Sequence, residues 1–269
     1  MSEKRSERQK TDDLETTCDR FLGGRIEIVQ PKSGAHRSGL DAVLLAASLP
    51  EGAKGDLIDL GAGVGVAGLA ALALNPRLRP TLVDNDPDAL RLAEHNARRT
   101  AELIAGAAMA RVVAADVTRS GQQRRGMGLE PQSADFVITN PPYNEAGKAR
   151  ASPHPERAHA HMLDDASLQA WIRTGIWLLR PKGQFTIIIR TTRLPLALET
   201  FGKALGGITV LPIHARADQA AARVLVHGRL GSKAPLRLLP GLVLHGKAGS
   251  DFLPACAAIF AGQGRLSMH

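Results

Sequence analysis

The sequence predicts an α/β fold built around a mostly parallel, doubly wound sheet. From residue 56 onward, apolar runs of strand length alternate with longer apolar or amphipathic runs of helix length. A glycine-rich stretch at residues 61–68 joins the first of these strands to the first helix, and polar residues directly follow several of the apolar runs. Alternating strands and helices are typical of a parallel sheet, and such sheets bind ligands outside the carboxyl ends of their strands.

A short lead-in precedes the alternating part. Residues 1–22 are mostly charged or polar, so we predict a disordered arm that lacks the apolar segment of a secretory signal. Residues 25–30 alternate apolar and polar side chains, which predicts a short strand. An Ala-rich helix is expected at residues 40–49, because Pro50 stops it. Residues 23–269 are predicted to form a single domain that contains this lead-in.

The α/β core is predicted from apolar runs and from the residues that bound them. Pro87 and Pro195 stand near the first turns of two expected helices, a position that proline favours. Residues 118–133 and 141–166 are polar and rich in glycine or proline, so we expect loops there. Strands are predicted at residues 56–60, 80–84, 111–115, 134–139 and 184–190, and helices at residues 66–74, 87–99, 167–179 and 194–205.

The pattern changes in the last quarter of the chain. Strand patterns joined by short turns occupy residues 208–213, 223–226 and 236–245. They predict an antiparallel extension of the sheet, followed by a helix at residues 252–262. We find no internal repeat that would indicate a solenoid or propeller.

Composition limits the classes of function. The net charge of +8 favours a polyanionic partner, and only 3% aromatic residues argue against a broad base-stacking platform. No apolar run of about 18 residues predicts a membrane span. Cys18 and Cys256 stand far apart, and the histidines at positions 154, 159 and 161 have no acid or cysteine at ligand spacing, so neither a disulfide nor a metal site is expected. A cytoplasmic location is the expectation, with monomer or dimer left open.

The glycine-rich stretch is a candidate ligand-binding loop. The motif Gly63-Val-Gly-Val-Ala-Gly68 lies between a predicted strand and helix, where glycine lets the backbone approach a ligand. Alone, it fits a dinucleotide or an S-adenosylmethionine site equally well. Asp84 ends the second strand, 23 positions after Gly61, where a carboxylate can accept both ribose hydroxyls.

Two other acids stand at strand ends or helix starts. Asp86 competes with Asp84 for the ribose role, but its position before Pro87 favours a helix N-cap. Asp116 ends the third predicted strand, where it either accepts from an adenine amino group or serves as a turn residue.

The most informative segment is Asn140-Pro141-Pro142-Tyr143, which directly follows the predicted strand at residues 134–139. The Asn140 amide and the Pro141 carbonyl can accept both hydrogens of a flat amino group, which localises its nitrogen lone pair. The prolines hold the backbone rigid, and Tyr143, the only tyrosine of the chain, can stack on a base. A nicotinamide dehydrogenase has no use for such a turn, and a structural loop with a buried tyrosine is the alternative.

These motifs resemble class I S-adenosylmethionine-dependent methyltransferases of the Asn-Pro-Pro-Tyr type, over about residues 25–230. The stretch at residues 34–46, the Pro-Lys-Gly at residues 181–183 and the basic C-terminal third are similar to the bacterial valine-tRNA adenine-N6-methyltransferases. Those enzymes modify the adenosine at tRNA position 37, next to the anticodon. The resemblance implies a Rossmann-like fold with a seven-stranded, mostly parallel sheet, an antiparallel last strand and helices on both faces.

The resemblance also implies roles for single residues. The methionine part of the cofactor would be held by Ser38, Asp41, Asp59, Gly61, Ala62, Gly63 and Gly65, its ribose by Asp84 and Asn85, and its adenine by Asp116 and Val117. The catalytic segment would be Asn140, Pro141, Pro142 and Tyr143, with Asn140 also beside the cofactor. From the charge pattern rather than the resemblance, we predict substrate-binding roles for four basic residues, with a solvated loop as the alternative for the first three: Lys148, Arg150, Arg157 and Arg193.

Several alternatives remain open at this point. The same segment serves release-factor glutamine methyltransferases, although those have a helical domain before the glycine loop. Adenine in ribosomal RNA or DNA would need the same base chemistry, and a silent RNA-binding module would need no chemistry at all. Asn144 and Glu145 stand where many relatives have a second aromatic residue. Further basic residues either form a face that binds the phosphate backbone or are charges scattered over the surface. These residues are Arg190, Arg216, Arg223, Arg229, Lys233 and Arg237.

Overall fold

The computed structural model describes residues 15–32, 39–142 and 164–268. Its first element is an antiparallel hairpin of β1 (Thr16–Phe21) and β2 (Ile26–Pro31), joined by a 3-10 turn at Leu22–Gly24. The predicted disordered arm over residues 1–22 was therefore wrong for its last part. One face of β1 is exposed, so its sequence carries little apolar signal, and the strand is held by its ladder to β2 and by the Gln30 side chain, which donates to Asp19 at 2.9 Å.

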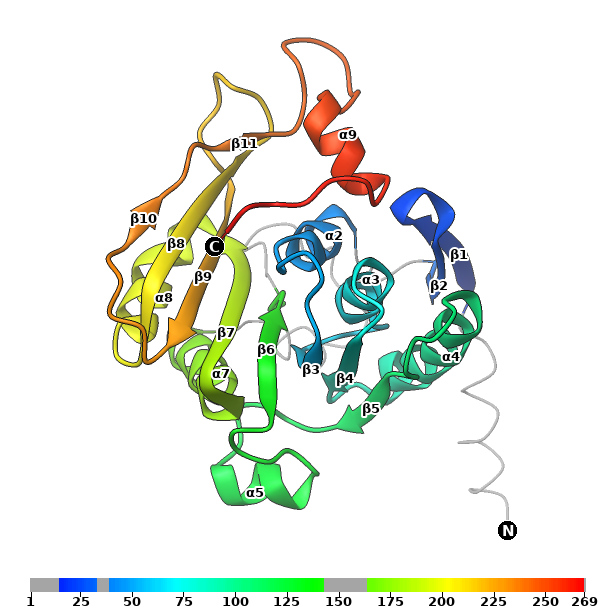
Figure 1. Ribbon diagram of the computed structural model, residues 1–269, viewed down its shortest axis with the longest axis vertical. Helices are drawn as coiled ribbons and strands as arrows, with labels where there is room; N and C mark the ends of the chain where they lie inside the picture. The colour runs from blue at the N-terminus through cyan, green and yellow to red at the C-terminus, as the bar shows by residue number, and fades with distance from the viewer. Residues whose placement is uncertain (1–14, 33–38, 143–163, 269) are drawn as a thin grey trace, which may run out of the picture.

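The central sheet confirms the predicted mostly parallel arrangement (Figure 1). Its seven principal strands lie in the order β5-β4-β3-β6-β7-β9-β8, and β9 alone runs in the direction opposite to the other six. Their bounds are β3 (Gly55–Leu60), β4 (Leu78–Asp84), β5 (Arg111–Ala114), β6 (Ala134–Thr139), β7 (Leu179–Arg190), β8 (Leu205–His214) and β9 (Arg223–Leu230).

Helices cover both faces of this sheet (Figure 1). One buried cluster joins the first face to α2 (Leu40–Ala47), α3 (Val66–Leu74) and α4 (Pro87–Leu103), and α9 (Pro254–Phe260) packs against α2. The second cluster joins the opposite face to α7 (Asp165–Leu178) and α8 (Leu194–Phe201). Among the described residues, none of the helices combines the length and apolarity needed to cross a membrane.

The structure corrects two expectations about the peripheral segments. The predicted loop at residues 118–133 contains α5 (Gly121–Gly126), which starts at a capping box between Ser120 and Gln123. That motif satisfies two backbone N–H groups and can begin a helix in a polar sequence. The region at 236–245 forms only β10 (Arg237–Leu238) and β11 (Leu242–Val243), and both pair with β8 in parallel rather than antiparallel fashion.

The strand order fixes where a ligand can bind. From β3 the chain proceeds to β4 and β5 on one side, then returns to β6 and β7 on the other. The carboxyl ends of β3 and β6 thus flank the switch point of the topology, where open α/β sheets have their binding crevice. The glycine loop follows β3 and Asn140 follows β6, so the fold brings both predicted motifs to this one crevice.

Candidate active site

The glycine loop leaves β3 through three residues with positive φ. Gly61, Gly63 and Gly65 have φ values of 68°, 55° and 93°, a region that L side chains rarely adopt. A Cβ at Gly61 would lie 2.5 Å from Cζ2 of Trp171, and one at Gly65 would lie 2.8 Å from Leu82. A Cβ at Gly63 would meet nothing within 4 Å in the described part of the chain, so Gly63 is the glycine that borders open space.

Alanine substitutions should distinguish Gly61, which packs against Trp171, from Gly63, which borders open space. Both Gly61→Ala and Gly63→Ala force a side chain into positive φ, which costs about 1–2 kcal/mol. Gly61→Ala should lose about 1–3 kcal/mol more, because its Cβ would collide with Trp171. Urea unfolding of the two variants measures the difference, and equal losses would contradict the packing described for Gly61.

Asp59 lies beneath the glycine loop rather than facing open space. Its side chain is 1% exposed, and Oδ2 accepts a hydrogen bond from the Gly68 N–H at 2.8 Å, in the first turn of α3. Burial raises the pKa of Asp59 to about 7, and the nearby Asp84 carboxylate adds to the rise, against the bond from Gly68. The carboxyl group of Asp59 thus binds the first turn of α3, directly after the glycine loop, through the Gly68 N–H.

This buried acid predicts a pH dependence of stability. The folded state holds the Asp59 proton up to about pH 7, whereas the unfolded chain releases it near 3.8, so the folded state binds more protons between these values. Stability from this group therefore falls as the pH rises from about 4 to about 7, by about 4 kcal/mol at 1.36 kcal/mol per pKa unit. Asp59→Asn should remove that slope. Urea unfolding at pH 5 and pH 8 tests it, and equal slopes in the two proteins would refute the shift.

Asp84, the last residue of β4, binds the backbone of the glycine loop. Its Oδ2 accepts from the Gly63 N–H at 2.8 Å, while Oδ1 accepts from the backbone of Asn85 at 2.8 Å and Asp86 at 3.0 Å. Because each carboxylate oxygen can accept about twice, Oδ1 is fully used by these bonds and one acceptor position remains, on Oδ2. Asp86 instead caps α4 through Asp88, as expected for an N-cap, so Asp84 is the acid that contacts the loop.

Asp116 and Val117 follow β5 on the same edge of the sheet. Asp116 accepts from Thr118 and from the Arg119 guanidinium at 2.9 Å. Burial alone would raise the pKa of Asp116, but the bonds from Thr118 and Arg119 outweigh it and hold the pKa below its usual range. The buried Val117 is fixed by its carbonyl, which accepts from Thr174 Oγ1 of α7 at 2.6 Å.

Asn140 carries the feature of the site that most directly indicates a ligand. Its Oδ1 is buried and has no hydrogen-bond partner in the described part of the chain. Leaving a buried carbonyl oxygen unpaired costs about 1–3 kcal/mol. Pro141 is buried beside it and Pro142 is half-buried, so the prolines hold the turn in place. At the end of β6, Asn140 Oδ1 is thus an acceptor whose hydrogen bond no described residue fills.

Two residues behind this turn have no obvious signal in the sequence. Thr139, the last residue of β6, is fully buried and donates through Oγ1 to the Leu60 carbonyl at 2.6 Å. Trp171 of α7 donates through Nε1 to the same Oγ1 at 2.8 Å. In the sequence, Trp171 reads as one more apolar residue of an amphipathic helix, and only the packing of α7 places it here.

The polar residues at the edge of the crevice are paired with each other. Asp41 at the start of α2 forms an ion pair with Arg223 at the start of β9. Arg193 pairs with Asp165, the first residue of α7. Both pairs lie close to the carboxyl end of β7. Arg223 is opposite Arg190, the last residue of that strand, and Arg193 follows Arg190 by three positions. The cofactor role predicted for Asp41 and the substrate role predicted for Arg193 remain predictions.

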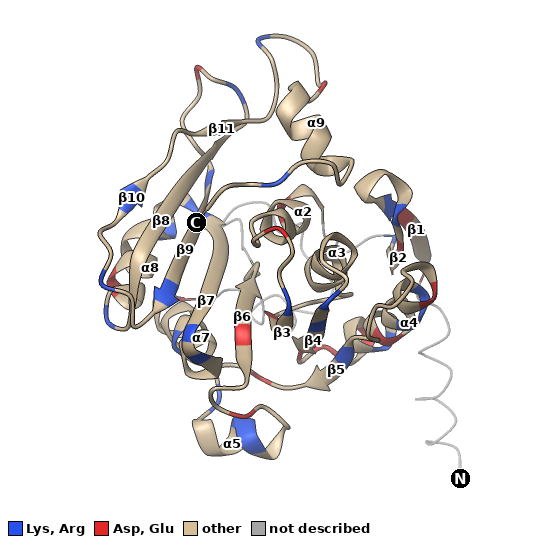
Figure 2. Ribbon diagram, in the orientation of Figure 1, with Lys and Arg blue, Asp and Glu red and all other residues tan. Residues whose placement is uncertain are grey.

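The basic residues of the C-terminal half do not form one face. Arg190, Arg216 and Arg223 lie at the crevice edge of β7, β8 and β9, whereas Arg229 lies at the opposite end, facing Gln184. Figure 2 shows Lys and Arg spread over several elements, including α5, α7 and β10. Of the residues predicted to bind phosphates, those near Arg190 are therefore the ones that lie beside the crevice.

Five residues of the predicted site lie outside the described residues. They are Ser38 before α2, the motif residue Tyr143, and Lys148, Arg150 and Arg157 of the segment that follows it. In the described ranges 15–32, 39–142 and 164–268, no group of three or more His, Cys, Asp or Glu residues could hold a metal ion.

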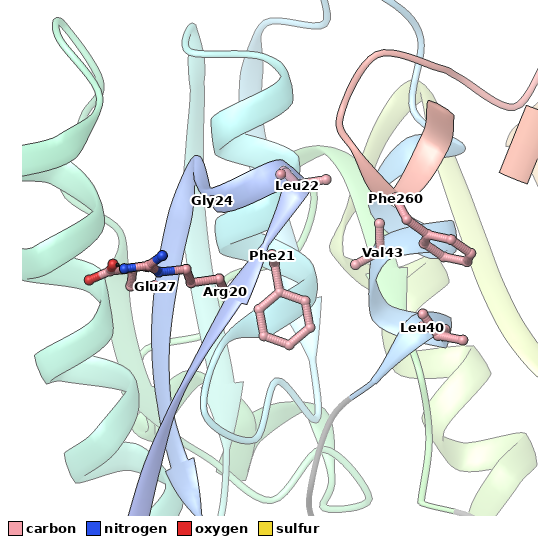
Figure 3. A pocket seen from close by; sticks show the side chains of 9 residues that line it. Arg20, Phe21, Leu22, Gly24, Glu27, Leu40, Val43 and Phe260 are labelled. Carbon is pink, nitrogen blue, oxygen red and sulfur yellow. Dashed lines mark hydrogen bonds and ion pairs between the residues drawn. The ribbon is translucent and has the colours of Figure 1, made fainter. Parts of the chain in front are cut away.

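A separate cavity of about 630 Å³ lies between the β1–β2 hairpin, α2 and α9 (Figure 3). Phe21, Leu40, Val43 and Phe260 form its apolar walls. Its charged groups, Arg20 and Glu27, pair with each other at 3.2 Å. The described residues predicted from the sequence to bind cofactor or base do not line it, although its wall residue Leu40 directly precedes Asp41 at the edge of the crevice.

Comparisons with known proteins agree with this geometry. The family described as methyltransferase small domain matches residues 37–204, which is more than half of the 269 residues. The tRNA1(Val) (adenine(37)-N6)-methyltransferase of Cronobacter sakazakii is 29% identical over 156 residues, which are 58% of this chain and 59% of that protein. The protein of the same name from a Flavobacteriaceae bacterium is 29% identical over 161 residues, 60% of this chain and 62% of that protein.

The matched part thus spans about three fifths of the length of these curated relatives. Among solved structures, a predicted O-methyltransferase from Agrobacterium tumefaciens superposes with a TM-score of 0.68 at 28% identity. That superposition covers 84% of this chain and 98% of the other.

Proposed function

Because the chain belongs to the methyltransferase small-domain family, we propose that it transfers a methyl group from S-adenosylmethionine to the exocyclic amino group of an adenine in RNA. The leading substrate is the tRNA adenosine beside the anticodon, at position 37. The names of the two curated relatives support this choice, since both are tRNA adenine-N6-methyltransferases.

The crevice fits the proposed cofactor. Gly63 is half-buried and borders open space, Asp84 has one acceptor position left on Oδ2 for a ribose hydroxyl, and Asp116 lies on the same edge for the adenine. The bound cofactor would supply an electrophilic methyl group. The protein's own task is then to align a weak nucleophile with it, which is mainly a matter of positioning.

The buried Oδ1 of Asn140, for which the described ranges contain no hydrogen-bond partner, is the observation that carries the proposal. An aromatic amino group is a poor nucleophile because its nitrogen lone pair is delocalised into the ring. Acceptors placed on its two hydrogens favour a pyramidal nitrogen, which localises the lone pair on that nitrogen for attack on the methyl group. Asn140 Oδ1 supplies one such acceptor and the Pro141 carbonyl a second, while Tyr143, outside the described residues, would stack on the extruded base.

The charge of the chain favours RNA over a protein substrate. A net charge of +8 gives a long-range attraction to phosphates, and Arg190 and Arg193 lie at the end of β7 beside the crevice. A glutamine side-chain amide could donate to Asn140 in the same way, so methylation of a protein is the outcome that the experiment must separate.

The test is methyl incorporation from labelled S-adenosylmethionine into four acceptors in parallel: unmodified tRNA, ribosomal RNA, DNA and total protein. Digestion and mass spectrometry then identify the modified nucleoside or residue. The proposal predicts N6-methyladenosine in tRNA, mapped to the anticodon loop. Label only in protein glutamine, or on another nucleoside, would overturn it.

A further inference from the structure

Helix α7 contacts the segments at the carboxyl ends of β3, β5 and β6, three of the four strand ends that form the crevice. Trp171 lies against Gly61 after β3, and its Nε1 donates to Thr139 at the end of β6. One turn further along, Thr174 donates to the Val117 carbonyl after β5 at 2.6 Å. A single rigid helix thus supports the loops proposed to hold the methionine part of the cofactor, its adenine and the target base.

The hydroxyl of Thr139 is the centre of this arrangement. It donates to the Leu60 carbonyl at 2.6 Å and accepts from Trp171 at 2.8 Å, so both of its roles are filled. Leu60 and Thr139 are direct neighbours in the parallel ladder of β3 and β6. Gly61 and Asn140 are the next residues on the two strands, so this bridge sets the separation at which the two motifs begin.

Besides donating this hydrogen bond, the indole ring of Trp171 limits sterically where Gly61 can lie. The position of a Cβ on Gly61 is only 2.5 Å from Trp171 Cζ2, so the ring fills the space directly behind the loop. Gly61 cannot move back toward α7 without displacing the ring, and the ring is tied to Thr139 by its N–H. Protein interiors resist such displacement because they are close-packed.

We propose that Trp171 is a positioning residue that sets the distance between the methyl donor and the amino group held by Asn140. The inference rests on the proposed function, since it assigns the donor to the glycine loop and the acceptor to Asn140. Transfer requires reacting atoms about 3–3.5 Å apart, and a shift of about 1 Å can lower the rate about 100-fold. Trp171 acts through Gly61 and Thr139 and touches neither reactant.

Trp171→Phe tests this role, because it keeps an aromatic ring but removes the N–H. We expect kcat to fall at least about 10-fold, with the Kd for S-adenosylmethionine changed by less than about threefold. Trp177→Phe is the matched control, since Trp177 lies on the same helix and stacks under Arg124, away from the crevice. Its kcat should stay at the wild-type value. Equal kcat values in the two variants would overturn the inference.

A double-mutant cycle and an activity-independent readout complete the test. Trp171→Phe combined with Thr139→Val should lose no more kcat than the worse single variant, because both changes break one bridge. The amide NMR signals of Gly61 and Asn140 should shift together in Trp171→Phe and stay in place in Trp177→Phe. If the wild type methylates no adenine, the proposed function fails. The two amide signals still test whether Trp171 couples Gly61 to Asn140, and unshifted signals would refute that coupling.

Discussion

Replacing Asn140 by Ala should lower kcat about 100-fold or more, the effect expected when one preorganised polar group is removed from a catalytic site. The variant loses the buried Oδ1, which has no hydrogen-bond partner among the described residues and which the proposed function assigns to the target amine. The fold should not suffer, because no described hydrogen bond to this oxygen is lost. Initial rates on tRNA and calorimetry with S-adenosylmethionine together measure the change.

The control for this variant is Asn140→Asp, which keeps an acceptor oxygen in place and should retain more activity than Asn140→Ala. Donor affinity should stay within about threefold of wild type in both, because the lost interaction belongs to the transition state. A matching loss of donor affinity and kcat in Asn140→Ala would mean that Asn140 serves the cofactor rather than the base.

Asp84→Ala is expected to produce the largest loss of cofactor affinity. It removes the ribose acceptor and also releases the Gly63 N–H, which Asp84 now holds at 2.8 Å. Hydrogen bonds to charged groups contribute about 1.5–3 kcal/mol each, so the Kd for S-adenosylmethionine should rise about 10- to 100-fold. Isothermal titration calorimetry measures it directly.

Asp86→Ala is the matched control, since Asp86 lies two residues away but caps α4 through the Asp88 N–H. It should cost about 1 kcal/mol of stability and leave donor affinity unchanged. If Asp86→Ala weakened the donor as much as Asp84→Ala, the ribose would have been assigned to the wrong acid.

Local patterns were sufficient to predict most of the fold. The helix at residues 66–74 and the strand at residues 134–139 have the predicted bounds, because each is an apolar run bounded by glycine or polar residues. The pairing partners of weak strands are not encoded locally. The exposed β1 depends on its ladder with β2, and β10 and β11 take their parallel direction from the path of the chain along β8.

The position of the candidate residues in the fold could be predicted for a similar reason, whereas their roles remain predictions. Motif spacing placed Gly61, Asp84 and Asn140 on one crevice, because strand ends of a parallel sheet share one edge. It could not show that Asp59 is turned under the loop to Gly68, nor that Asp41 pairs with Arg223, 182 positions away. It also missed Trp171, because its contacts to Gly61 and Thr139 exist only once α7 packs on the sheet.

The crevice between β3 and β6 is tested most directly by a crystal structure with S-adenosylhomocysteine and adenosine. We expect the sulfur beside Gly63 and the adenosine amino nitrogen about 3 Å from Asn140 Oδ1. Adenosine bound elsewhere, or an Asn140 Oδ1 that bonds to the protein itself in that complex, would contradict it.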